Sequence, residues 1–245
     1  MERSCIMDTI KIEKRQVKMI AHRGLSGLEK ENTHAAFVAA GNRSYFGIET
    51  DVHRTADGYF VLCHDDSTQR ISADSMVVED TAYEALTRLR LTDMDGIQGR
   101  RDLVIPDLAD YIAICKKYGK VCVLELKNAF APEDIQKIVA IIAAMGYLEQ
   151  VIFISFNLPN LQVLRRLLPD QRIQYLLDEY DENTIKILRE NRLDLDIRYT
   201  ALTPRRIAAL HDAGIEVNCW TVNDPEHAKT LIAAGVDYIT TNLLE

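Results

Sequence analysis

The sequence lacks the features typical of disulfide-stabilised, secreted or membrane-spanning proteins. It has five cysteines and no C-x-x-C spacing, which argues against a disulfide framework or a zinc site. Cys63, Cys122 and Cys219 lie in apolar runs, where we expect small buried hydrophobic residues. Residues 1–8 lack the apolar core of a signal peptide, and no run reaches the ~18 apolar residues of a membrane span. We therefore expect a cytoplasmic protein without stable membrane insertion.

The sequence also lacks an excess of positive charge, since its formal net charge is −8 at pH 7. Nucleic acids and anionic membranes are bound through basic patches, so we expect neither as the main partner. An anionic small molecule is compatible with this composition if a few cations are placed close to it.

The order of apolar runs favours one class of fold. The first strand-like run is not followed by G-x-G-x-x-G, which argues against a dinucleotide-binding fold. Strand-like runs instead alternate with helical segments, as in repeated βα units with a parallel sheet. The eight principal strands are predicted at residues 17–21, 47–51, 121–126, 151–155, 173–177, 193–197, 215–220 and 236–240.

Eight such strands predict an α/β protein with a (β/α)8 TIM barrel as its one domain, residues 1–245, because this fold needs about 250 residues. The run 59–63 adds a short strand, and the turn-rich stretch at about 66–105 is predicted to be a small insertion after the second barrel strand. We expect the eighth helix to be missing or a stub, with segment 8–16 covering the gap or the barrel floor. An exposed flank there would favour a homodimer.

Catalytic residues of such barrels lie at the C-terminal ends of the strands. Glu49, Asp51 and Glu125 occupy these ends, and carboxylate oxygens suit Mg²⁺ or Ca²⁺ better than zinc. His22 and His64 also follow apolar runs, and a pKa of about 6.5 lets imidazoles act as base and acid near neutral pH. Other candidate side chains at strand ends are Arg23, Lys127, Ser155, Asn157, Trp220, Asn223, Thr241 and Asn242.

Seven short motifs share a defined order along the chain. They are His22-Arg23-Gly24, Glu31-Asn32-Thr33, Glu49-Thr50-Asp51-Val52, Asp57-Gly58, His64-Asp65, Leu124-Glu125-Leu126-Lys127 and Trp220-Thr221-Val222-Asn223. Together they resemble the glycerophosphodiester phosphodiesterase family, and the similarity extends from about Val17 to Asn242. That family consists of metal-dependent barrel hydrolases.

The resemblance implies three roles: a general acid/base pair, the ligands of one divalent cation (Mg²⁺ or Ca²⁺), and contacts to the phosphate and the glycerol or alcohol group. His22 and His64 match the general acid/base pair, and Glu49, Asp51 and Glu125 match the metal ligands. Arg23 and Lys127 match the phosphate contacts, and Trp220 matches the contact to the glycerol or alcohol group. The implied activity is hydrolysis of a glycerophosphodiester, such as glycerophosphocholine or glycerophosphoethanolamine, to sn-glycerol 3-phosphate and an alcohol. Which histidine is the acid, and whether water or a neighbouring glycerol hydroxyl attacks, stay open.

Two departures from the family pattern concern the rim of the site. The last strand usually ends in Thr-Asp-Pro and here ends in Thr241-Asn242-Leu243, so a carboxylate is lost near the pocket. After His64-Asp65, an arginine is usually followed by two threonines, whereas Arg70 precedes Ile71-Ser72. The contacts of the insertion, and hence the choice of substrate, are therefore open.

Structural roles are the alternative for each candidate. The histidine pair could cap strand ends, Glu125 and Lys127 could form an ordinary ion pair, and Trp220 could pack the barrel. Glu31 is expected to support its loop rather than bind metal. Surface or helix packing is expected for His34, His53, His211 and His227.

Two other functions compete with glycerophosphodiester hydrolysis. A lysophospholipase D-like enzyme would cleave a larger lipid diester and need an apolar collar, for which Leu25, Leu28 and Met76 are candidates. A catalytically silent phosphate-binding barrel is the second. The presence of both histidines argues against it.

Overall fold

Eight parallel strands close into a barrel in the computed structural model, which describes residues 8–245. The strands pair in the order β1-β9-β8-β7-β6-β5-β4-β2, and β1 also pairs with β2. They are β1 (Lys18–Ala21), β2 (Gly47–Arg54), β4 (Val121–Leu126), β5 (Val151–Ser155), β6 (Arg172–Leu177), β7 (Asp194–Arg198), β8 (Val217–Trp220) and β9 (Tyr238–Thr241). The predicted TIM barrel is confirmed.

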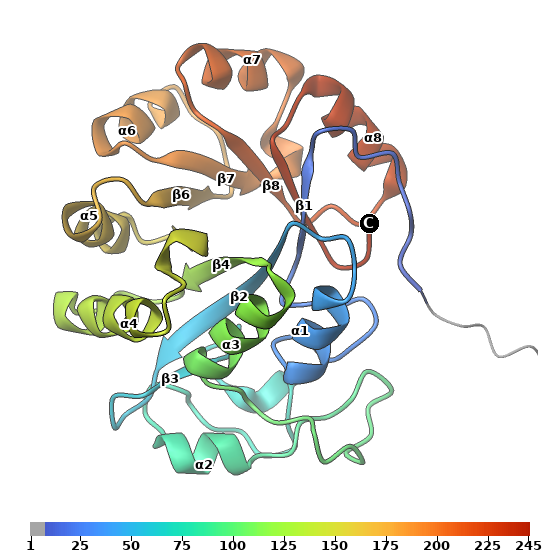
Figure 1. Ribbon diagram of the computed structural model, residues 1–245, viewed down its shortest axis with the longest axis vertical. Coiled ribbons are helices and arrows are strands. Elements are labelled where there is room, and N and C mark those ends of the chain that lie inside the picture. The colour runs from blue at the N-terminus through green and yellow to red at the C-terminus, as the bar shows by residue number, and fades with distance from the viewer. Residues whose placement is uncertain (1–7) are drawn as a thin grey trace, which may run out of the picture.

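Helices between successive strands surround the barrel (Figure 1). They are α1 (His34–Gly41), α3 (Leu108–Tyr118), α4 (Pro132–Ala144), α5 (Leu158–Leu167), α6 (Thr184–Asn191), α7 (Pro204–Asp212) and α8 (Pro225–Ala234). Side-chain caps set several starts: Thr33 accepts from the Ala36 N–H before α1, and Asp107 from the Asp110 N–H before α3. Helix α3 therefore begins at Leu108, directly after its cap Asp107.

The insertion after β2 has a core of its own. Strand β3 (Phe60–Leu62) pairs antiparallel with β2, and α2 (Tyr83–Arg88) lies outside the ring of helices (Figure 1). A buried cluster that includes Ile71, Leu86 and Leu103 is separate from the main core. This agrees with the predicted small insertion on the barrel.

No helix follows β9 in the described chain, as predicted. Residues near the N-terminus lie beside the last residues instead, because Ile10 pairs with Leu244 and Ile12 N–H donates to the Glu245 carbonyl. The Asp8 carboxylate also pairs with Arg43, just after α1. Segment 8–16 thus covers part of the gap, and a homodimer stays a prediction.

The described residues include no helix that is long and apolar enough to cross a membrane. Cys63, Cys115, Cys122 and Cys219 are buried and unpaired, in line with small hydrophobic residues. Cys5 and most of segment 1–8, for which we expected no signal peptide, lie outside the described residues.

Candidate active site

The loop after β1 presents His22 and Arg23 to the barrel mouth. Gly24 has φ of +76°, and a Cβ there would lie 2.6 Å from the Ala36 Cβ, so only glycine lets this loop lie so close to α1. Arg23 itself has φ of +52°, a conformation that costs a non-glycine residue free energy. This backbone turns the Arg23 N–H toward Glu49 Oε2, at 2.8 Å.

His64 reaches the same mouth because β2 extends beyond its predicted end at Asp51. The additional residues up to Arg54 pair with β3, which runs back antiparallel. The Cys63 N–H then donates to the Asp51 carbonyl, and His64 follows directly. The short run at 59–63 therefore forms the strand that carries the second histidine.

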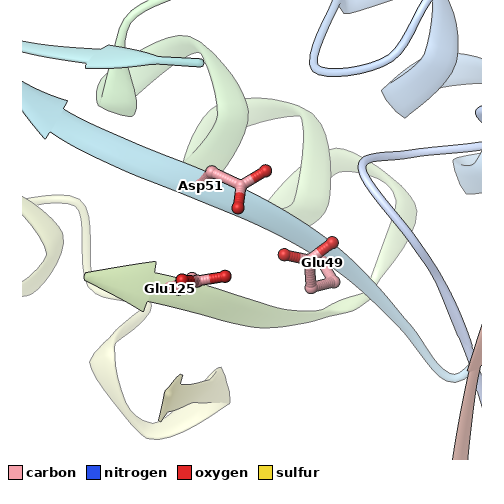
Figure 2. Close-up of side chains that lie close together, drawn as sticks. All are labelled: Glu49, Asp51 and Glu125. Carbon is pink, nitrogen blue, oxygen red and sulfur yellow. The ribbon is translucent and has the colours of Figure 1, made fainter. Parts of the chain in front are cut away.

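Three carboxylates converge between β2 and β4. Glu49 and Asp51 point to one face of β2, and Glu125 faces them from β4 (Figure 2). One oxygen of each lies within 4.8 Å of the others, and all three side chains are buried. Their strands pair in register, with Asp51 opposite Glu125.

Only part of this negative charge is compensated. Burial and the Asp51 charge raise the pKa of Glu49, and the same two causes raise the pKa of Glu125 to about 8. Burial alone would raise the pKa of Asp51, but Lys127 and Arg23 outweigh it and hold that pKa below its usual range. Lys127 Nζ lies 3.4 Å from Asp51 Oδ1 and 3.0 Å from Glu125 Oε1.

These residues fit a hard divalent cation. The cluster supplies oxygen ligands only, as Mg²⁺ and Ca²⁺ prefer. The raised pKa values of Glu49 and Glu125 reflect burial and repulsion among the carboxylates. A bound cation would offset both effects, because it stabilises the charged form of each carboxylate.

His22 is held by an amide. Its Nδ1 lies 2.7 Å from Asn242 Oδ1, and because an amide oxygen only accepts, Nδ1 carries the proton. Asn242 is itself fixed, since its N–H donates to Asn223 Oδ1 at 2.8 Å. Burial, reinforced by Arg23, lowers the pKa of His22 to about 4, although the Asn242 hydrogen bond opposes this. His22 is therefore neutral at pH 7, with its lone pair on Nε2.

His64 is held by a carboxylate within a chain of ion pairs. Its Nδ1 donates to Asp65 Oδ1 at 2.6 Å, and Arg70 Nε donates to Asp65 Oδ2 at 2.7 Å. Arg70 also donates twice to Glu31, both at 2.8 Å, and Arg23 Nη1 donates to Glu31 at 2.9 Å. Burial lowers the pKa of His64, and Asp51 and Asp65 counteract it. Glu31 thus supports its loop, as expected.

A cavity of about 90 Å³ lies between the two histidines and the carboxylate cluster. All predicted site residues except Asp51 and Lys127 line it, namely His22, Arg23, Glu49, His64, Glu125 and Trp220. Trp220 stacks edge-to-face with Phe156 at 5.7 Å between ring centroids, and the Arg198 guanidinium lies 5.7 Å from the Trp220 ring.

Several lining residues were not among the candidates from the sequence, and the two that matter most for the chemistry of the cavity wall are Phe156 and Asp196. Phe156 lies between Ser155 and Asn157, the candidates at that strand end, but Ser155 Oγ donates to the Leu126 carbonyl and Asn157 caps α5. Asp196 alternates with apolar residues in the strand predicted at 193–197. This alternation was the available signal: it puts Asp194 and Asp196 on one face of the strand, but it does not say which face is inward.

The other strand-end residues and histidines have local partners. Thr241 Oγ1 donates to Asn223 Oδ1. The remaining imidazoles pair with carboxylates away from the cavity: His34 with Asp110, His53 with Glu79, His211 with Asp237 and His227 with Asp224. His34, His211 and His227 are at least partly exposed, which fits surface packing. His53 is fully buried on β2, so the expected surface or helix packing is wrong for this residue.

Comparison with known proteins gives one consistent family. The profile of the glycerophosphoryl diester phosphodiesterase family matches residues 22–245. The chain is 30% identical to a glycerophosphodiester phosphodiesterase of Caldanaerobacter subterraneus, over 91% of this chain and 93% of the relative.

Solved structures agree with this match. A phosphodiesterase from Oleispira antarctica, in complex with the product sn-glycerol 3-phosphate, superposes with a TM-score of 0.82 at 25% identity, covering 92% of this chain and 93% of that one. A glycerophosphodiester phosphodiesterase from Parabacteroides distasonis gives 0.78 at 27% identity, covering 97% and 94%. The chain therefore belongs to the glycerophosphoryl diester phosphodiesterase family.

Proposed function

We propose that the protein hydrolyses small glycerophosphodiesters, such as glycerophosphocholine or glycerophosphoethanolamine, to sn-glycerol 3-phosphate and an alcohol. The observation that carries this proposal is the convergence of a buried carboxylate triad and two histidines on one small cavity at the barrel mouth. The family match and the product bound to the Oleispira antarctica relative support it.

Glu49, Asp51 and Glu125 would hold one divalent cation, Mg²⁺ or Ca²⁺. When bound, such a cation supplies positive charge that stabilises the phosphate oxygens as the phosphodiester is cleaved. Arg23 adds a positive charge at the cavity wall, and Lys127 adds another behind the triad. The Arg23 and Lys127 side chains lower the electrostatic cost of bringing an anionic substrate close to three carboxylates.

His22 is proposed as the general base. With Nδ1 donating to Asn242, Nε2 is the nitrogen left to take a proton from the attacking hydroxyl. That hydroxyl belongs either to water or to the neighbouring carbon of the substrate's glycerol. Burial, reinforced by the Arg23 charge, lowers the pKa of His22 to about 4, and the neutral amide of Asn242 only partly offsets this, so the ring is unprotonated before the reaction.

His64 is proposed as the general acid. Burial lowers the pKa of His64, but the Asp51 and Asp65 carboxylates oppose this and favour the protonated ring. The protonated ring can donate from Nε2 to the oxygen of the leaving alcohol. Trp220 would form the wall against which the glycerol or alcohol group packs. The acid and base are thus distinguished by the charge of the group bound to Nδ1.

The cavity favours a small substrate over a lipid diester. Its volume is about 90 Å³. Among the residues expected to form an apolar collar, Leu25 is fully buried in the main core, whereas Leu28 and Met76 are partly buried against the main core and the insertion core.

Metal removal and product analysis test the proposal. Purified protein with glycerophosphocholine should release glycerol 3-phosphate, lose this activity in a chelator and regain it with Mg²⁺ or Ca²⁺. Glu125→Gln should abolish it, whereas Glu149→Gln, a change at an exposed residue before β5, should not. Faster turnover of a lysophospholipid would support the lipid alternative. A wild-type protein that binds phosphate but cleaves no diester with either ion would be a silent barrel and contradict the proposal.

A further inference from the structure

Asp196 is a buried carboxyl group without a partner in the wall of the cavity. It lies on β7, is 2% exposed and lines the same cavity as the histidine pair. Its Oδ1 is fully buried, and the described residues provide no hydrogen bond to it. Buried polar groups in proteins are nearly always satisfied, so the partner of such a group is to be sought in a ligand.

Its position faces the carboxylate triad across the barrel. Between β7 and β2 lie β8, β9 and β1 on one side and β6, β5 and β4 on the other. A phosphate held near the triad would therefore direct one of its substituents toward Asp196. Leu176 lies opposite Asp196 on the neighbouring strand β6, and Leu176 and Trp220 add apolar surface to the cavity wall.

The chemistry of this carboxyl suits a hydroxyl group. Burial raises the pKa of Asp196 well above its usual range, and Glu125 adds to the effect. Burial therefore favours the uncharged acid, which has one O–H donor and a carbonyl acceptor. An alcohol offers the same pair, and an uncharged acid does not repel the phosphate.

We propose that Asp196 binds a hydroxyl of the substrate's glycerol moiety and so selects glycerol-containing phosphates over alkyl phosphates. The inference rests on the proposed function, because it assumes that phosphate is held near the triad.

Binding of two matched ligands tests this without any need for turnover. In the presence of Mg²⁺, and separately Ca²⁺, calorimetry compares sn-glycerol 3-phosphate with n-propyl phosphate, which has the same three carbons and no hydroxyl. The wild type should bind glycerol 3-phosphate about tenfold more tightly, the effect of one or two hydrogen bonds. Equal affinities, or no binding of either ligand, would overturn the inference whatever the variants do.

Variants locate the effect. Asp196→Leu should remove the preference while leaving the affinity for propyl phosphate unchanged, and Asp196→Asn should keep part of it. Asp194→Asn is the matched control, since Asp194 lies on the same strand outside the cavity and accepts from the Glu216 N–H. Because the replaced group is unsatisfied, Asp196→Leu should fold with an unchanged or raised melting temperature.

The two proposals fail in different ways. If Asp196→Leu lowers the affinity for both ligands equally, Asp196 supports the triad, and the inference is contradicted. A wild type that prefers glycerol 3-phosphate but cleaves no diester would reject the proposed activity and leave the role of Asp196 intact.

Discussion

His22 and His64 line one cavity, but different regions of the molecule hold them. His22 is fixed by the barrel itself, because its partner Asn242 directly follows β9, the neighbour of β1. His64 is fixed from the insertion, through Asp65 and Arg70. Both partners select a tautomer, but a carboxylate favours the protonated ring more strongly than a neutral amide does. Two rings of the same type can therefore take opposite roles.

Removal of either ring should have the largest effect. His22→Ala and His64→Ala should each lower kcat for glycerophosphocholine by about 10²- to 10⁴-fold, the contribution typical of general acid or base catalysis. With p-nitrophenol as leaving group, which needs no proton, His64→Ala should recover most of its activity and His22→Ala should not. Steady-state rates on the two substrates measure this. The opposite pattern would exchange the roles of the two histidines.

Removal of the carboxylate behind His64 should have the next largest effect. Asp65→Asn should lower kcat by about 10- to 100-fold, since a hydrogen bond to a charged partner is replaced by a neutral one. Asp66→Asn is the control, because Asp66 is adjacent and exposed and accepts from Asn128 outside the cavity. Equal rates for both variants would show that His64 does not depend on Asp65.

Asn242→Asp should make the two histidines alike. The introduced carboxylate should raise the pKa of His22 from about 4 by about one to three units. A base must be unprotonated, so the acidic limb of the kcat/KM profile should move to higher pH, with little change above pH 8. A pH series on glycerophosphocholine measures this. If the alkaline limb moves instead, His22 acts as the acid.

The barrel half of this comparison was more predictable than the insertion half. Proline and glycine mark the helix ends, and apolar runs mark the strands, so local signals fix the order of the βα units. In the insertion, isolated β-bridges such as that between Ser72 and Leu91 join residues far apart in the sequence. Such contacts cannot be predicted from a short stretch of sequence. The loss of a carboxylate at Asn242 was visible, but its hydrogen bond to His22 depends on the pairing of β1 with β9. Asp196 was missed because only the strand register shows which side faces the cavity.

Arg70 should have the smallest effect, since it acts on His64 only through Asp65. Its hydrogen bonds help to hold the pKa of Asp65 and that of Glu31 at about 2, although burial opposes this. Arg70→Met should raise the pKa values of Asp65 and Glu31 and lower kcat by about two- to tenfold. The loss is modest because half-exposed ion pairs are screened by solvent.

Arg88→Met is the control, since Arg88 is exposed and pairs with Glu84 on α2. The loss should affect kcat more than KM, because the ion pairs position the acid and not the substrate. A change confined to KM would mean that Arg70 contacts the substrate, and the insertion would then select substrates rather than orient His64.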